Sequence, residues 1–158
     1  MSDGAGAGRV SHFRGRSEHA LDSKGRLNIP TRFRDVLRRQ YDERLMVAPW
    51  HNCLRAYPLP QWEELEMTLR AEGKTQPQMI KLLRFLVGGV VDCPLDKQGR
   101  VLLPPGLRAG CEVDKDVVVS GMITYFEIWD KAVWERENRP AEEDFQAFEQ
   151  IMIQSGLM

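Results

Sequence analysis

The chain has 158 residues, of which 42% are hydrophobic and 28% are charged, and its formal net charge is −1. These values are typical of an ordinary globular protein with one compact domain or two small ones. The longest apolar stretch, Phe85 to Val91, is far shorter than the roughly 20 residues of a membrane-spanning helix. The sequence therefore predicts a cytoplasmic protein without a membrane segment. Residues 1–12 begin Gly/Ala-rich, lack a signal-peptide pattern and are expected to be a flexible tail.

The near-neutral total hides an uneven distribution of charge. Residues 1–108 contain 18 Lys and Arg against 12 Asp and Glu, whereas residues 109–158 contain 4 against 11. A basic body beside an acidic C-terminal part is compatible with binding a polyanion through one face, and equally with two ordinary solvated surfaces.

Short strands and turns are predicted for the first part of the chain. Asp22-x-x-Gly25 indicates a turn, because Asp can bond to the backbone two residues ahead and Gly permits positive φ. Pro30 ends the strand that follows this turn, and Thr31 is expected to cap a short helix. The predicted elements are a strand over 16–21, the turn, a strand over 27–29, a helix over 32–40 and strands over 45–48 and 53–57.

Two longer helices, over 60–71 and 76–87, are then predicted from apolar residues at helical spacing. A C-terminal helix begins at about Glu142, with Phe145, Phe148, Ile151 and Met152 on one face. The strand-and-turn order returns between these segments, with strands over 90–95, 101–103, 116–120 and 124–129.

This return is a sequence repeat. Asp22-Ser23-Lys24-Gly25-Arg26 matches Asp96-Lys97-Gln98-Gly99-Arg100 at an offset of 74 residues, and beyond residue 45 the offset is 72. The length change therefore falls between residues 34 and 45, which predicts a turn outside the core there. Each unit has about 45 residues, marginal for a hydrophobic core of its own. We expect the two units to share one core.

No catalytic set is found. The sequence lacks a Gly-x-Ser-x-Gly motif, a phosphate loop and a Cys/His signature, and Asp22 and Asp96 are better explained as turn residues than as acid/base catalysts. The three cysteines and three histidines are widely spaced, so buried free thiols are expected, with no metal site and no cofactor.

The repeated basic residues point to a polyanion. Lys24 and Arg26 flank the glycine of the first turn, and Lys97 and Arg100 that of the second. A merely solubilising turn needs no particular residue, yet arginine recurs, and its planar guanidinium fits phosphates and guanine edges. Arg14, Arg16, Arg32 and Arg34 could extend the same patch.

Residues 13–137 resemble the MraZ family of bacterial regulators. The resemblance rests on Phe13-Arg14-Gly15, the two Asp-x-x-Gly-Arg turns, Ile29-Pro30-Thr31-Arg32-Phe33-Arg34, Tyr57-Pro58-Leu59-Pro60-Gln61-Trp62, Leu107-Arg108 and Phe126-Glu127-Ile128-Trp129-Asp130. It implies an α+β fold in which two tandem SpoVT/AbrB-type swapped-hairpin units form one intrachain β-barrel-like core, with added helices.

The implied domains are unit one (residues 16–60), linking helices (61–88), unit two (90–133) and a C-terminal helix (138–158). The resemblance also implies a nucleoid-associated regulator of the division and cell-wall gene cluster. Such a protein would bind repeated double-stranded promoter boxes as a ring homo-oligomer and take no small-molecule ligand. The DNA-contacting candidates are Arg14, Lys24, Arg26, Lys97 and Arg100. Lys97 stands one position earlier in its turn than Lys24, so we do not expect equal DNA roles for the two lysines. Unit one carries more positive charge around its turn, in Arg14, Arg16, Lys24 and Arg26, so we expect it to make the stronger contact and the Arg100 turn to be auxiliary.

Two other functions remain open. One is an antidote-like DNA-binding module that holds a protein partner with the C-terminal helix, and the other is an oligomeric scaffold that does not bind DNA. Co-purification of a small protein would favour the first, and an absence of salt-dependent DNA binding would favour the second.

Overall fold

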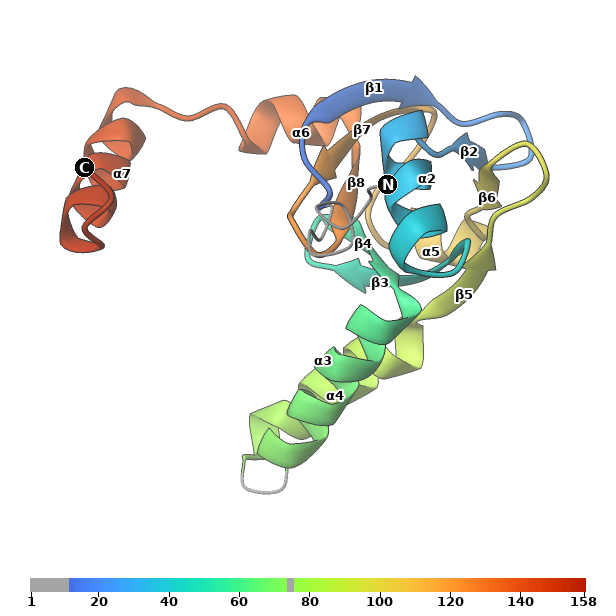
Figure 1. The fold of residues 1–158 in the computed structure, drawn as a ribbon, viewed down its shortest axis with the longest axis horizontal. Coiled ribbons are helices and arrows are strands. Elements are labelled where there is room, and N and C mark those ends of the chain that lie inside the picture. Colours follow the sequence, from blue (N-terminus) through green and yellow to red (C-terminus); the bar gives the residue numbers. More distant parts are fainter. Residues whose placement is uncertain (1–11, 74–75) are drawn as a thin grey trace, which may run out of the picture.

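The computed structural model describes residues 12–73 and 76–158, which form the α+β fold expected from the sequence (Figure 1). The predicted tail lies outside these residues except for His12.

A six-stranded antiparallel sheet has the order β1-β7-β8-β4-β3-β5, and β2 and β6 form a separate two-stranded ladder. The strands are β1 (Arg16–Ala20), β2 (Arg26–Asn28), β3 (Arg44–Trp50), β4 (Cys53–Pro58), β5 (Val91–Pro94), β6 (Arg100–Leu102), β7 (Asp116–Gly121) and β8 (Phe126–Asp130). The helices are α2 (Thr31–Gln40), α3 (Leu59–Glu72), α4 (Pro77–Gly89), α5 (Pro105–Ala109), α6 (Lys131–Glu137) and α7 (Glu142–Gln154).

The two units exchange strands. The first strand of each unit pairs with the third strand of the other, β1 with β7 and β5 with β3. The second strands pair with each other, as do the fourth. The main core therefore draws on both units, and an aromatic cluster of Phe13, Phe33 and Phe126 has ring centroids 5.0–5.3 Å apart. The prediction of an interlocked, barrel-like core is confirmed.

The register of these pairs reveals a pseudo-two-fold axis. Leu27 pairs with Val101 in the β2/β6 ladder, and Arg55 pairs with Glu127 between β4 and β8. The members of each pair are separated by 74 and 72 residues, which are the two offsets of the sequence repeat. Each pair thus joins equivalent residues of the two units across the axis.

The Arg55–Glu127 pair shows what the duplication allows. Arg55 Nε lies 3.6 Å from Glu127 Oε2, and Trp129 Nε1 donates a hydrogen bond of 3.0 Å to Glu127 Oε1. The Arg55 guanidinium lies over the Trp50 ring at 4.5 Å and the Tyr125 ring at 5.2 Å. Two identical chains related by a true two-fold axis would place like residues at this point. A single chain with two units can place opposite charges there.

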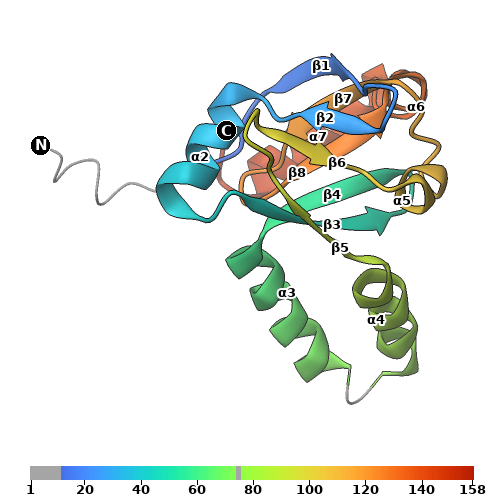
Figure 2. The same ribbon diagram turned by 90° about the vertical axis from the view of Figure 1, so that its right-hand side faces the viewer.

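The helices between the units form a hairpin that projects from the barrel (Figures 1 and 2). Trp62 and Leu69 of α3 and Leu86 of α4 are buried in a second cluster with Tyr57 and Ala48 of the sheet. The two helices predicted here from apolar residues at helical spacing are therefore confirmed. In the described part of the chain, no helix is long and apolar enough to cross a membrane.

Two local predictions were wrong. Thr31 does not cap α2; it is the first residue of the helix, and the N–H groups of Phe33 and Arg34 donate to the Pro30 carbonyl oxygen instead. The stretch between residues 34 and 45 is not a turn outside the core. The helix continues to Gln40 and buries Val36 and Leu37, whereas its counterpart α5 has only five residues. In unit two, Cys111 and Val113 of the loop that follows α5 also join the main core.

The prediction of buried free thiols is confirmed, because Cys53, Cys93 and Cys111 are all buried and unpaired with one another. Burial raises the pKa of the Cys53 thiol to about 12 and that of Cys93 to about 11. Both groups are therefore protonated and unreactive at neutral pH.

The contribution of the Arg55–Glu127 pair to stability can be tested by substitution of Glu127. We expect Glu127→Gln to lower the free energy of unfolding by about 1–3 kcal/mol, because it leaves a half-buried guanidinium without its counter-charge. Glu127→Arg should cost more, since it restores the like-charged pair that identical units would have. Urea denaturation measures both. Glu135→Gln, on the exposed surface of α6, is the control and should stay within about 0.5 kcal/mol of wild type. Equal stability of Glu127→Arg and Glu127→Gln would contradict the argument.

Candidate nucleic-acid interface

The turn of unit one is held by a single carboxylate. Asp22 Oδ1 accepts hydrogen bonds from the backbone N–H groups of Lys24 (2.9 Å) and Arg26 (2.8 Å), and Asp22 Oδ2 accepts one from Arg26 Nε (2.6 Å). Gly25 has a φ of +84° at the tip, a conformation that glycine adopts without strain. Asp22 therefore organises the turn, as its sequence context predicts, and also holds the arginine.

The turn of unit two has the same geometry. Asp96 Oδ1 accepts from the backbone N–H groups of Gln98 and Arg100, and Oδ2 from Arg100 Nε, each at 2.9 Å. Gly99 has a φ of +78°. The position equivalent to Lys24 is thus Gln98, while Lys97 replaces Ser23. The arginines are equivalent between the units, and the lysines are not.

These hydrogen bonds act on the acidity of both carboxyl groups. The backbone N–H of Arg26, together with the Arg26 side chain and the Lys24 backbone, lowers the pKa of Asp22 to about 2. The Arg100 backbone and side chain likewise lower the pKa of Asp96. Both carboxylates are therefore ionised, and both arginines stay paired, throughout the physiological pH range.

Each arginine is anchored only through Nε. Within the described part of the chain, no hydrogen bond or ion pair engages the terminal nitrogens of Arg26 or Arg100. Their side chains remain partly accessible, at 32% and 24%. The guanidinium groups are thus fixed in direction yet still have donors for an external acceptor.

The turns are also packed by the opposite unit. The Arg108 guanidinium lies against Gly25, where an added Cβ would be 3.0 Å from it, and the Arg34 guanidinium lies against Gly99, where an added Cβ would overlap it. Arg108 Nε donates to the Leu103 carbonyl oxygen (2.9 Å), whereas Arg34 Nε is buried without a hydrogen-bond partner among the described residues. Arg34 and Arg108 therefore pack against the turns of the opposite unit.

The β2/β6 ladder brings the two turns onto one face. Its antiparallel pairing places the β1–β2 turn at one end and the β5–β6 turn at the other, both toward the viewer in Figure 2. The backbone links them further, because the Leu103 N–H donates to the Gly25 carbonyl oxygen and the Ile29 N–H to that of Gly99, both at 3.0 Å. The structure thus brings together four of the predicted residues, Lys24, Arg26, Lys97 and Arg100.

Arg14 and Arg16 do not join this group. Arg14 precedes β1, so this five-residue strand, roughly 16 Å long, separates it from the turn. Its carbonyl oxygen accepts a hydrogen bond of 3.0 Å from Arg32 Nε. The Arg16 guanidinium lies over the Trp134 ring at 5.4 Å. The extra positive charge that was expected to favour unit one is therefore not at its turn.

Asn28 was missed as a contact candidate. It is exposed on the outer side of the ladder, directly across from Arg100, while Leu102 is exposed across from Arg26. The signal was present in the alternation of Leu27, Asn28 and Ile29, which places Asn28 outward, but the partner strand could not be read from the sequence.

The surface formed by Lys24, Arg26, Asn28, Lys97 and Arg100 is called the ladder face below. It offers cationic and amide donors on a two-stranded ribbon, and a ribbon of this kind fits the major groove of B-DNA. Among the described residues, no group of three or more His, Cys, Asp or Glu side chains is placed to hold a metal ion.

Comparison with known proteins places this geometry in a family. A family model described as MraZ protein, with the words "antitoxin-like" in its description, matches residues 12–85 and again residues 86–155. The chain belongs to the MraZ family. The two matches cover the two units, so the family model recognises the duplication that the fold displays.

Three MraZ relatives illustrate the similarity, each named "Transcriptional regulator MraZ". The protein of Syntrophobacter fumaroxidans is 38% identical over 146 residues, covering 92% of this chain and 97% of its own. That of Desulfitobacterium hafniense is 39% identical, with 92% and 99% covered. That of Acidithiobacillus ferrooxidans is 43% identical, with 78% and 85% covered. MraZ is a family of transcriptional regulators and not of enzymes.

The arginines packed against the two turns predict that alanine at Gly25 and at Gly99 lowers the free energy of unfolding by different amounts. Gly25→Ala and Gly99→Ala both force positive φ on alanine, which costs about 1–2 kcal/mol. Gly99→Ala should cost more because its Cβ also meets Arg34. Thermal or urea unfolding measures the difference. Removing the obstacle with Arg34→Ala should bring the added cost of Gly99→Ala down to that of Gly25→Ala; an unchanged difference would rule out this contact.

The hydrogen bonds to the Asp22 carboxylate predict the pH range in which this group titrates. Its folded pKa of about 2 lies below the ordinary unfolded value of about 3.9, so its stabilising contribution is complete above pH 4 and is lost as the pH falls toward 2. Side-chain carboxyl chemical shifts followed by NMR should show a midpoint near 2. Arg26→Ala removes the side-chain donor but keeps the backbone N–H, so the midpoint should rise only part of the way. A full return to the ordinary value would contradict the leading role of the backbone hydrogen bond.

Proposed function

We propose that the chain is a sequence-specific DNA-binding transcriptional regulator that reads double-stranded promoter boxes with its ladder face. The observation that carries this proposal is the pair of carboxylate-clamped arginines presented at the two ends of one ladder on one side of the molecule. The names of the relatives support it, since each is called a transcriptional regulator.

The ladder face has the chemistry for reading base edges. Arg26 and Arg100, directed by Asp22 and Asp96, have terminal donors that no described residue engages and that suit the O6 and N7 atoms of guanine. Asn28 lies across the ladder from Arg100 and suits adenine. Lys24 and Lys97 are exposed and suit backbone phosphates. Arg14, at the other end of β1, is proposed as an outer phosphate contact only.

A single ladder face can neutralise few phosphates, so its affinity for one box is low. We propose that several chains assemble into a ring and that repeated boxes engage several ladder faces together, which raises the effective local concentration. In this proposal residues 16–60 and 90–133 are the two DNA-facing units. The target is the promoter of the division and cell-wall gene cluster, and the bound protein is associated with the nucleoid.

The multivalent arrangement predicts a steep dependence on box number. Apparent affinity should rise at least tenfold from a fragment with one box to a fragment with three or four boxes, measured by gel shift at fixed salt. The chain's own upstream promoter region, intact and with boxes removed, supplies the fragments. Equal affinity for one box and for several would refute the multivalent model.

Substitutions on the ladder face should distinguish the contacts that read bases from those that bind phosphates. Arg26→Ala and Arg100→Ala should each weaken binding at least tenfold and relax sequence preference, because each removes a base-reading donor. Lys24→Ala should weaken binding to all sequences alike and reduce the salt slope by about one unit.

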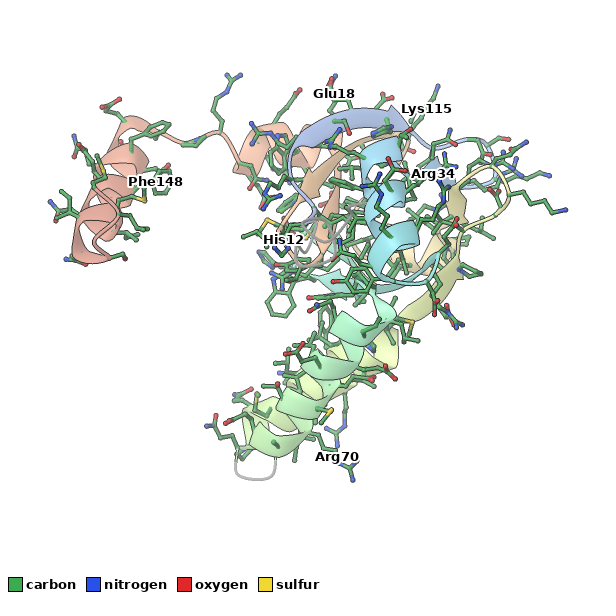
Figure 3. All side chains as sticks on the ribbon, in the orientation of Figure 1. His12, Glu18, Arg34, Arg70, Lys115 and Phe148 are labelled. Atoms are coloured by element: carbon green, nitrogen blue, oxygen red, sulfur yellow. The ribbon has the colours of Figure 1, made fainter. Side chains whose placement is uncertain are left out.

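Arg70→Ala is the matched control, because Arg70 is exposed on α3 toward the far end of the helical hairpin (Figure 3). It removes one positive charge without touching the ladder face. If Arg70→Ala weakened binding as much as Arg26→Ala, general charge and not the ladder face would determine affinity. Circular dichroism confirms that each variant is folded.

A further inference from the structure

The C-terminal helix presents an apolar face that no other segment among residues 12–73 and 76–158 covers. All residues of α7 are exposed, and the aromatic side chains of Phe145 and Phe148 are 55% and 46% accessible. Ile151 and Met152 continue the same face and are also exposed. Figure 1 shows α7 standing apart from the barrel and from the α3/α4 hairpin, and Figure 3 labels Phe148 on it. Such a helix gains stability chiefly by packing against a partner.

The chain carries a second uncovered apolar surface on α4. Phe85 is 48% accessible and lies between two grooves of about 420 and 460 Å³. The first groove is bordered by Trp50, His51, Lys81 and Leu82, and the second by Arg84 and Gly88, among others. Both grooves are open to solvent on either side of the exposed Phe85 ring, so each offers room for an aromatic side chain of a partner. Lys81, Phe85, Arg84 and the two grooves are called the α4 surface below.

The two surfaces are complementary in charge. α7 carries four acidic residues and no basic one, whereas α4 carries Lys81 and Arg84 and no acidic one. Glu149 lies one helical turn from Phe145 on the flank of the apolar face, and Lys81 lies one turn from Phe85. An apolar centre with opposite charges at its rim is the usual composition of a protein–protein interface.

We propose that α7 of one chain docks on the α4 surface of a second copy of this chain. This interface rests on the self-association within the proposed function and gives it a structural basis. Because the donor helix and the acceptor surface are different parts of the molecule, the contact is head-to-tail. Repeated contacts of this kind generate a ring when the rotation closes and a filament when it does not.

A mixing experiment tests the interface with the full chain. Phe148→Asp removes the donor and leaves the α4 surface, whereas Phe85→Asp removes the acceptor and leaves α7. Size-exclusion chromatography with light scattering should show wild-type oligomers, and each variant alone should self-associate at least tenfold more weakly. An equimolar mixture should form a one-to-one heterodimer, because one donor and one acceptor remain. Both side chains are about half exposed, so both variants should fold.

A charge-reversal pair identifies the partners more closely. Glu149→Lys and Lys81→Glu should each weaken self-association several-fold, and their combination in one chain should restore much of it. Variants that stay oligomeric, or a mixture that stays monomeric, overturn the proposed interface. A small unrelated protein bound to α7 in place of a second copy overturns it as well.

The outcomes separate this interface from the proposed function. If the α7 and α4 variants still form wild-type oligomers, the ring proposal stands and only this interface fails. If the wild-type chain is monomeric at tens of micromolar, both self-association proposals fail. Binding to a single box, measured on the same variants, should be unchanged in either case, since neither substitution touches the ladder face.

Discussion

The reciprocal pairing of β2 with β6 is the constraint on which the rest of the structure depends. Each of these strands has three residues and could not persist alone. Together they join the two units on the pseudo-two-fold axis, and each turn receives a backbone hydrogen bond and a packed arginine from the other unit. The shape of either turn is therefore a property of both units.

The same exchange explains how the turns combine rigidity with accessibility. Asp22 and Asp96 fix the arginines from within their own turns, and Arg108 and Arg34 support the glycines from the opposite unit. A guanidinium fixed through Nε loses little freedom when a ligand binds, so more of the interaction energy is available for recognition. Asp22 and Asp96 carry negative charge, and by accepting hydrogen bonds from the Nε atoms of Arg26 and Arg100 they also fix the direction of these two guanidinium groups.

Duplication within one chain has freed the two units to differ. Arg55 and Glu127 occupy the position on the axis where identical units would repel each other. Lys24 and Gln98 occupy equivalent places in turns of the same geometry, and α2 has ten residues where α5 has five. These differences surround a core to which both units contribute.

The sequence by itself determined the two units, their shared core and the Asp-x-x-Gly-Arg turns, because repeat spacing, turn chemistry and alternation are local signals. It placed the linking helices, the helix over 32–40 and the start of the C-terminal helix within two residues of their observed bounds, though it misjudged Thr31 as the cap of α2. Only the tertiary structure decided which basic residues share a face. Arg14 and Arg16 lie near Lys24 in sequence but are separated from it by a strand, and Arg100 lies far away in sequence but joins it through an antiparallel ladder. Strand pairing between distant segments follows from the packing of the whole core, and no local pattern around Asn28 or Arg34 encodes it.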